Sequence, residues 1–139
     1  MKNGSLQEAT VDKFMTVSPQ TIGADQTLAK ADKLMRQHQI RHLPVLDAGR
    51  LVGILSDRDI KLVESFKDVD PEIMTVSEAY TEEPFSVSPK TPLAEVCAKM
   101  AQRKYGSVLI VENNKLVGIF TWIDALNAMN SLIDEEKTH

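Results

Sequence analysis

The residues most suited to chemistry in this sequence lie where two buried strands are expected to end. Ser56 and Thr121 each follow an apolar run, and an aspartate, Asp59 or Asp124, stands three positions later. Hydroxyl-x-x-Asp is typical of a capping box, which satisfies free amides at the start of a helix. The same arrangement would let the aspartate accept both vicinal hydroxyls of a ribose beside a helix N-terminus. The two interpretations are compatible, and the sequence does not choose between them.

A second candidate cluster, Arg41-His42, lies between an expected helix end and the strand that follows. Arginine provides a forked donor suited to phosphate, and histidine provides a donor whose charge changes near neutral pH. The segment from Leu28 to Leu62 holds seven Lys and Arg against four Asp and Glu, in a chain whose net charge is −4. This local excess of positive charge favours an anionic ligand. The alternative is an exposed loop whose arginine extends into solvent.

Other kinds of chemistry have little support in the sequence. The chain has no phosphate-binding glycine loop, no nucleophile elbow and no His-Glu-x-x-His zinc motif. His38 and His42 have the spacing of metal ligands on a helix, but Pro44 predicts that the helix ends before His42. Cys97 is the single cysteine and is expected to be a small buried hydrophobe. We therefore expect neither an enzyme nor a metal site.

These motifs belong to an internal repeat with an offset of 65 residues. The match runs without a gap from Pro19 to Leu62 and contains ten identities, where chance would give roughly three. Each copy reads strand, helix, strand, strand, helix, and its two longer strands form a hairpin whose turn carries Gly49 or Asn114. Each half is short for a core of its own, so we expect the halves to share one core and to form a ligand cleft at their junction.

Outside the repeat, the sequence suggests where the chain divides. Met15-Thr16-Val17-Ser18 recurs as Met74-Thr75-Val76-Ser77 at an offset of 59, which indicates a six-residue acidic insertion at Glu78–Glu83. We expect a first repeat at 11–65, a linker with this insertion at 66–83, a second repeat at 84–130 and a frayed tail at 131–139. The acidic balance, polar N-terminus and short apolar runs favour a cytoplasmic protein that binds neither nucleic acid nor membrane.

The chain resembles a tandem pair of cystathionine β-synthase (CBS) domains, often called a Bateman module, over nearly its whole length. The motifs that carry the resemblance are Phe14-Met15-Thr16 ahead of Pro19, Arg41-His42-Leu43-Pro44-Val45, and Leu-Val-Gly-Ile followed by Ser56-Asp57-Arg58-Asp59 or Thr121-Trp122-Ile123-Asp124. The resemblance implies an α/β (α+β) fold in which two β-α-β-β-α repeats pack about a pseudo-twofold axis. It also implies that adenosine-containing ligands bind in clefts between the repeats.

The resemblance also implies roles for the candidate residues. Asp59 and Asp124 would bind the ribose in two related clefts, with Ser56 and Thr121 as their hydroxyl partners. In the Asp124 cleft, the base would be lined by Tyr105-Gly106-Ser107. The phosphates would be reached by Arg41 and His42 from the other repeat.

The second cleft, which holds Asp59, would be poorer in charge. Thr16 and Ile40 would line the base there. The opposing repeat offers only the neutral Gly106-Ser107 for phosphate, although Arg58 would compensate in part. The two clefts are therefore expected to be unequal.

By this resemblance, the chain is a regulatory sensor for AMP, ADP, ATP or S-adenosylmethionine that requires no cofactor and acts on a partner protein in trans. The alternative is a ligand-free scaffold for dimerisation or partner binding. The late apolar residues would form a stripe on the last helix that a small monomer cannot cover, so we expect a homodimer. These residues are Leu126, Met129, Leu132 and Ile133.

Overall fold

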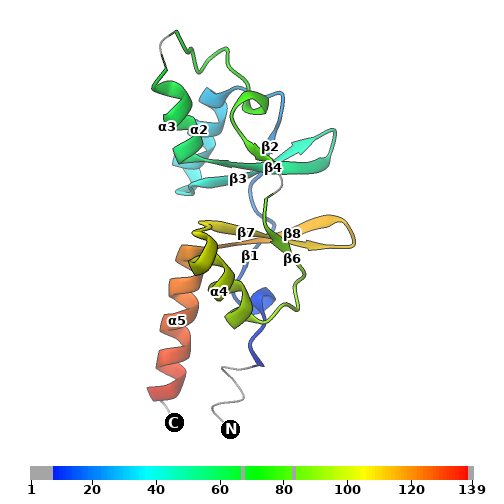
Figure 1. Ribbon diagram of the computed structural model, residues 1–139, viewed down its shortest axis with the longest axis vertical. Helices are drawn as coiled ribbons and strands as arrows, with labels where there is room; N and C mark the ends of the chain where they lie inside the picture. Colours follow the sequence, from blue (N-terminus) through cyan, green and yellow to red (C-terminus); the bar gives the residue numbers. More distant parts are fainter. Residues whose placement is uncertain (1–7, 67, 83, 138–139) are drawn as a thin grey trace. The chain divides into compact units, whose positions relative to one another are not determined.

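The computed structural model describes residues 8–66, 68–82 and 84–137, which fold into two compact units (Figure 1). The Asp59 unit comprises residues 19–84, and the Asp124 unit joins residues up to 18 with those from 85 onward. Both units combine helices with a four-stranded sheet, which confirms the mixed α+β fold. No helix in the described part of the chain is long and apolar enough to cross a bilayer.

The Asp59 unit has a sheet in the order β2-β3-β4-β5. Strand β2 runs parallel to β3, and the other two pairings are antiparallel. Helix α2 connects β2 to β3, and α3 follows β4 directly, as the repeat predicts. The elements are β2 (Ile22–Gly23), α2 (Leu28–His38), β3 (His42–Asp47), β4 (Arg50–Ser56), α3 (Asp57–Glu64), the 3-10 helix η2 (Val76–Glu78) and β5 (Thr81–Glu82).

The Asp124 unit repeats this topology with a sheet in the order β1-β8-β7-β6. Its β6 is parallel to β7, and β8 pairs antiparallel with both β7 and β1. The N-terminal strand β1 therefore occupies the place that β5 has in the other unit. The elements are the 3-10 helix η1 (Val11–Lys13), β1 (Thr16–Val17), β6 (Ser86–Val87), α4 (Leu93–Arg103), β7 (Ser107–Glu112), β8 (Lys115–Thr121) and α5 (Trp122–Lys137).

Each unit has its own hydrophobic core, and the expectation of a single shared core is wrong. Leu28, Leu43 and Leu55 are among the fully buried residues of the Asp59 unit, and Val108 and Phe120 among those of the Asp124 unit. Each cluster brings together residues of the helices, the hairpin and a 3-10 segment, so the 3-10 segment adds apolar area that the sequence repeat did not include.

Two local predictions from the sequence are confirmed at the hairpins. The turn between β3 and β4 places Ala48 at φ 52° and Gly49 at φ 81°, and the turn between β7 and β8 places Asn113 at φ 52° and Asn114 at φ 62°. Two consecutive residues with positive φ form the turn that matches the twist of a tight hairpin. Glycine and asparagine are the residues that tolerate this conformation best.

The supposed acidic insertion is not an insertion. Val76 is fully buried in the core of the Asp59 unit, and its N–H donates to the carbonyl of Gln26 over 2.8 Å. Val11 makes the matching bond to Thr91 over 2.9 Å in the Asp124 unit. Val76 is thus the counterpart of Val11, at the offset of 65, and not of Val17. Part of the expected linker at 66–83 therefore belongs to the Asp59 unit.

The expected frayed tail from residue 131 is also wrong, because α5 continues to Lys137. Leu132 packs against the core of the Asp124 unit and anchors this extension. A helix is held mainly by the burial of one face, so an apolar residue late in the segment extends it.

Val76→Ala tests this assignment of the 3-10 segment. Removing two buried methyl groups should lower the free energy of unfolding by about 2 kcal/mol. Val17→Ala is the matched control, because the sequence echo at an offset of 59 pairs Val17 with Val76. Val17 is 63 % exposed and Val76 is 0 % exposed, so the control should lose little stability. Urea unfolding of both variants measures the difference. Equal losses would contradict the placement of Val76 in the core.

Candidate nucleotide site

The strand-to-helix junctions hold their aspartates by reciprocal capping bonds. In the Asp59 unit, the Ser56 N–H donates to Asp59 Oδ2 over 2.9 Å, and the Asp59 N–H donates to Ser56 Oγ over 3.0 Å. In the Asp124 unit, the Thr121 N–H donates to Asp124 Oδ2 over 2.9 Å, and the Asp124 N–H donates to Thr121 Oγ1 over 3.4 Å. The capping interpretation is confirmed for both junctions. Each carboxylate is thereby held at the first turn of a helix, where the helix dipole favours negative charge.

Asp124 also receives a bond from a third element. The Thr16 hydroxyl on β1 donates to Asp124 Oδ1 over 3.1 Å. Gly118 permits this approach, because a Cβ at that position would lie 2.5 Å from the Met15 sulfur and 3.0 Å from the Thr16 carbonyl oxygen. The structure thus brings Thr16 to Asp124, whereas the sequence interpretation had grouped it with Asp59.

The residue that sequence reasoning missed is Thr81. Thr81 pairs with Ile54 between β5 and β4, as Thr16 pairs with Ile119 between β1 and β8. Thr81 therefore occupies in the Asp59 unit the strand position that Thr16 has in the Asp124 unit. The signal was present, because the two threonines are 65 residues apart; the echo at an offset of 59 concealed it.

Arg41 and His42 lie beside the Asp59 junction. His42 pairs with Ser56 in the β3–β4 ladder, and the Arg41 carbonyl accepts the N–H of Asp57 over 3.0 Å. Ile40 is the residue just before them and packs against the core of the same unit. The structure places this cluster next to Asp59 within its own unit. The assignment of Arg41 and His42 to the Asp124 site, across the two repeats, stays a prediction.

Burial of His42 lowers the pKa of its imidazole below the usual 6.5, although the negative charges of Asp57 and Asp59 oppose this effect. Arg41 lowers the pKa further through its positive charge. The lowered pKa favours the neutral imidazole in the ligand-free protein, and the role of His42 as a cationic phosphate ligand stays a prediction. A neutral imidazole still offers one N–H donor.

In the Asp124 unit, the segment that corresponds to Ile40-Arg41-His42 is Tyr105-Gly106-Ser107, which carries no charged side chain. Ser107 pairs with Thr121, and the Gly106 carbonyl accepts the N–H of Trp122 over 3.3 Å. The Tyr105 ring stacks on Phe85 with the ring centroids 5.3 Å apart, so it contributes to packing inside this unit. Arg58, the remaining predicted residue, is exposed in the first turn of α3.

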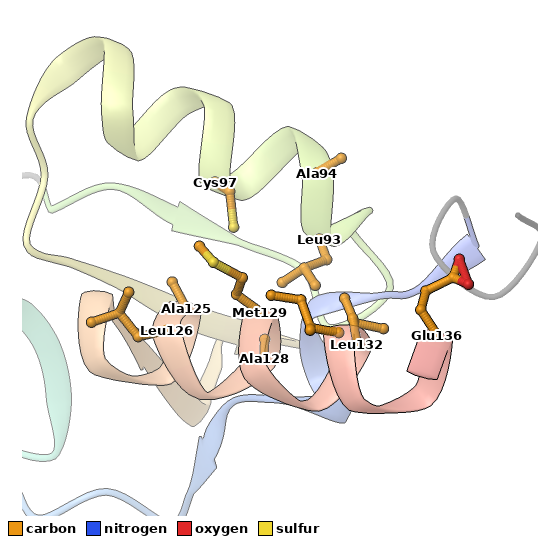
Figure 2. A pocket seen from close by; sticks show the side chains of 10 residues that line it. Leu93, Ala94, Cys97, Ala125, Leu126, Ala128, Met129, Leu132 and Glu136 are labelled. Carbon is orange, nitrogen blue, oxygen red and sulfur yellow. The ribbon is translucent and has the colours of Figure 1, made fainter. Parts of the chain in front are cut away.

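A separate apolar groove lies between α4 and α5, with a volume of about 660 Å³ (Figure 2). Leu93 and Cys97 of α4 face Met129 and Leu132 of α5 across it. Burial raises the pKa of the Cys97 thiol, so the thiol stays protonated and behaves as a small hydrophobe. The sequence predicted the apolar residues of α5 but not the groove that they form with α4.

The residues that the structure describes do not form a metal site at His38 and His42. Helix α2 ends at His38 and His42 lies in β3, so the two histidines do not share a helix. In the described ranges, no three His, Cys, Asp or Glu side chains come together as a metal site would require.

Comparison with known proteins identifies the family of the chain. The family model of the CBS domain matches residues 11–64 and 76–131, so the chain belongs to the CBS domain family as a tandem pair. It is 36 % identical over 124 residues to the CBS domain-containing protein YhcV of Bacillus subtilis, covering 88 % of each chain.

Solved structures show the same fold. A crystal structure from Vibrio cholerae, provisionally assigned to acetoin utilization (AcuB), is 30 % identical with a TM-score of 0.85, covering 94 % of this chain and 97 % of the other. The CBS domain pair of protein MJ0100, solved in complex with 5′-methylthioadenosine and S-adenosyl-L-methionine, is 25 % identical with a TM-score of 0.77. That comparison covers 88 % of this chain and 97 % of the other.

His42 gives a pH-dependent stability that can be measured. The lowered pKa means that, below about pH 6.5, the unfolded state takes up a proton before the folded state does. The free energy of unfolding should therefore decrease as the pH falls from 7.5 to 5. His42→Gln should reduce this decrease, whereas the control His38→Gln, which changes an exposed histidine, should retain it. Urea unfolding at several pH values tests both; identical pH profiles for wild type and His42→Gln would contradict the burial argument.

Proposed function

We propose that this CBS pair is a regulatory module that binds an adenosine-containing ligand, with the carboxylates of Asp59 and Asp124 as its ribose acceptors. The observation that carries the proposal is the position of Asp124 at the start of α5, with the Thr16 hydroxyl 3.1 Å from its Oδ1. A carboxylate held at a helix N-terminus is suited to vicinal ribose hydroxyls. The complex of MJ0100 with two adenosine derivatives supports the choice of ligand class.

The remaining candidate residues take supporting roles in this proposal. The segments that precede β3 and β7 lie next to the two aspartates, so they would contact the base or the 5′ group of the ligand. These segments are Ile40-Arg41-His42 and Tyr105-Gly106-Ser107. Arg58, Thr81 and Thr16 would complete the surroundings of the ribose. We propose that ligand binding in the cytoplasm changes how the module acts on a partner protein in trans.

A thermal-shift screen with AMP, ADP, ATP, S-adenosylmethionine and adenosine tests the proposal. A ligand that binds only the folded state raises the melting temperature by mass action. A rise that saturates with one or more of these compounds is expected. No rise with any of them at millimolar concentration would favour the alternative, a ligand-free scaffold.

Asp124→Ala separates ribose binding from helix capping. Loss of the cap should lower the free energy of unfolding by about 1 kcal/mol. Asp124→Asn keeps one acceptor oxygen for the cap but removes the charge and one ribose acceptor, so its stability should stay closer to wild type. Both variants should bind the ligand of this unit at least about tenfold more weakly, as expected for a lost charge-assisted bond. Unchanged affinity by calorimetry in both would reject Asp124 as a ribose ligand.

We further propose that the α4–α5 groove is covered by a second copy of the chain. Trp122, Leu126, Met129 and Ile133 recur at spacings of four, three and four along α5, and each is 46–55 % exposed. Apolar residues at this spacing line the contact surface between paired helices. Helix α2 of the Asp59 unit corresponds to α4 and carries an ion pair of Asp32 and Arg36 where α4 has the uncharged Cys97 and Ala101.

Met129→Glu tests this self-association. A charge in the groove should oppose burial against a second copy and shift the chain towards monomer. Leu62→Glu is the control, because Leu62 is 60 % exposed on α3 of the other unit. Light scattering at tens of micromolar should report a dimer for wild type and Leu62→Glu. A monomeric wild type would contradict the proposal.

A further inference from the structure

The two helices that form the α4–α5 groove run antiparallel to each other (Figure 2). Leu93 at the start of α4 lies beside Leu132 near the end of α5, and Cys97 one turn later lies beside Met129. The C-terminal end of α4 is therefore at the same end of the groove as the first turn of α5.

The two ends of the groove carry opposite charge within the Asp124 unit. The end at the last turn of α4 is basic, and the end at the last turn of α5 is acidic. The basic end holds Lys99, Arg103 and Lys104 against Asp124, and the acidic end holds Glu95, Asp134, Glu135 and Glu136 against Lys137. A surface with opposite charges at its two ends is complementary to a copy of itself that is turned end to end.

The exposed apolar residues of α5 fit the same arrangement. Trp122, Leu126, Met129 and Ile133 are separated by four, three and four positions, so the spacing is the same in both directions. An antiparallel copy of α5 places Trp122 opposite Ile133 and Leu126 opposite Met129, with a two-fold axis between residues 127 and 128. A parallel copy would match these residues equally well, but it would bring the two acidic ends together.

The helices of the Asp59 unit do not repeat this apolar face. At the offset of 65, charged residues stand where α5 has its apolar ones: Lys61, Glu64 and Asp68 in place of Leu126, Met129 and Ile133. Burial of a charged side chain is costly unless it is paired. The contrast between the two units favours association through the Asp124 unit.

We propose that two copies associate through the α4–α5 grooves of their Asp124 units alone, with the two α5 helices antiparallel and the basic end of each groove against the acidic end of the other. This inference rests on the proposed self-association and adds its orientation and the charges that select it. Lys104 of one copy then faces Glu136 of the second copy, and the two-fold axis repeats this contact.

Distances between spin labels measure the orientation. Cys97→Ala removes the single cysteine, and a label is then placed through Asn127→Cys or Asp134→Cys. Residues 127 and 134 are two turns apart on the same side of α5, so they differ mainly in their distance from the two-fold axis. In the antiparallel dimer the two labels at position 127 are nearly level along the helix axis, whereas the two at position 134 are about 20 Å apart along it. A parallel dimer would give the same short distance at both positions.

Reversal of single charges tests the contact between the groove ends. Lys104→Glu and Glu136→Lys should each weaken the dimer by about tenfold, because each replaces two attractive contacts by two repulsive ones. The double variant should recover the wild-type dissociation constant to within about threefold. Lys115→Glu is the matched control, since it makes the same charge change at the hairpin tip, about 20 Å along β8 from Thr121, and should resemble wild type. Sedimentation equilibrium at low ionic strength provides the dissociation constants.

The outcomes separate this inference from the self-association on which it rests. A wild-type chain that is monomeric at tens of micromolar would remove both. If the chain is a dimer in which the labels at position 134 are as close as those at position 127, the antiparallel orientation is overturned and the self-association stands. If the double variant is as weak as the single ones, the contact of Lys104 with Glu136 is overturned. If Leu62→Glu dissociates the dimer, association is not confined to the Asp124 unit.

Discussion

The reciprocal hydrogen bonds between a hydroxyl residue that ends a strand and an aspartate three residues later are the interaction on which both units depend. Ser56 with Asp59 and Thr121 with Asp124 satisfy amides that the helix cannot satisfy itself. They also set the direction in which each helix leaves its hairpin. Because the aspartate is held by the cap, its carboxylate has a fixed position at the helix N-terminus.

The remaining fold brings further groups to this carboxylate. A glycine in each second hairpin strand lets the outer strand approach closely, which places Thr16 against Asp124 and Thr81 on the matching strand position near Asp59. The segment before each first hairpin strand bonds to the helix start. The backbone geometry around the aspartate is therefore common to both units, whereas the side chains on that backbone differ between them.

The parts of the structure that depend on residues close together in the chain could be predicted from the sequence. The hairpins follow from turn residues that tolerate positive φ, and the capping boxes follow from Ser/Thr-x-x-Asp. The pairing of β1 with β8 could not be predicted, because a two-residue strand has no periodicity and is held by a partner about a hundred residues away. For the same reason Thr16 was grouped with Asp59. Thr81 was missed because the echo at an offset of 59 concealed its match to Thr16 at an offset of 65. The burial of His42, which lowers the pKa of its imidazole, also depends on tertiary packing.

The central claim is that adenosine ligands bind at the capped helix starts. Amide chemical-shift mapping of the isotope-labelled protein during titration with AMP and 5′-methylthioadenosine tests it most directly. We predict that the largest shifts cluster at the first turns of α3 and α5, in Ser56–Asp59 and Thr121–Asp124, and on the strand residues Thr16 and Thr81. Shifts confined to the α4–α5 groove, or no saturable shifts at all, would contradict the account.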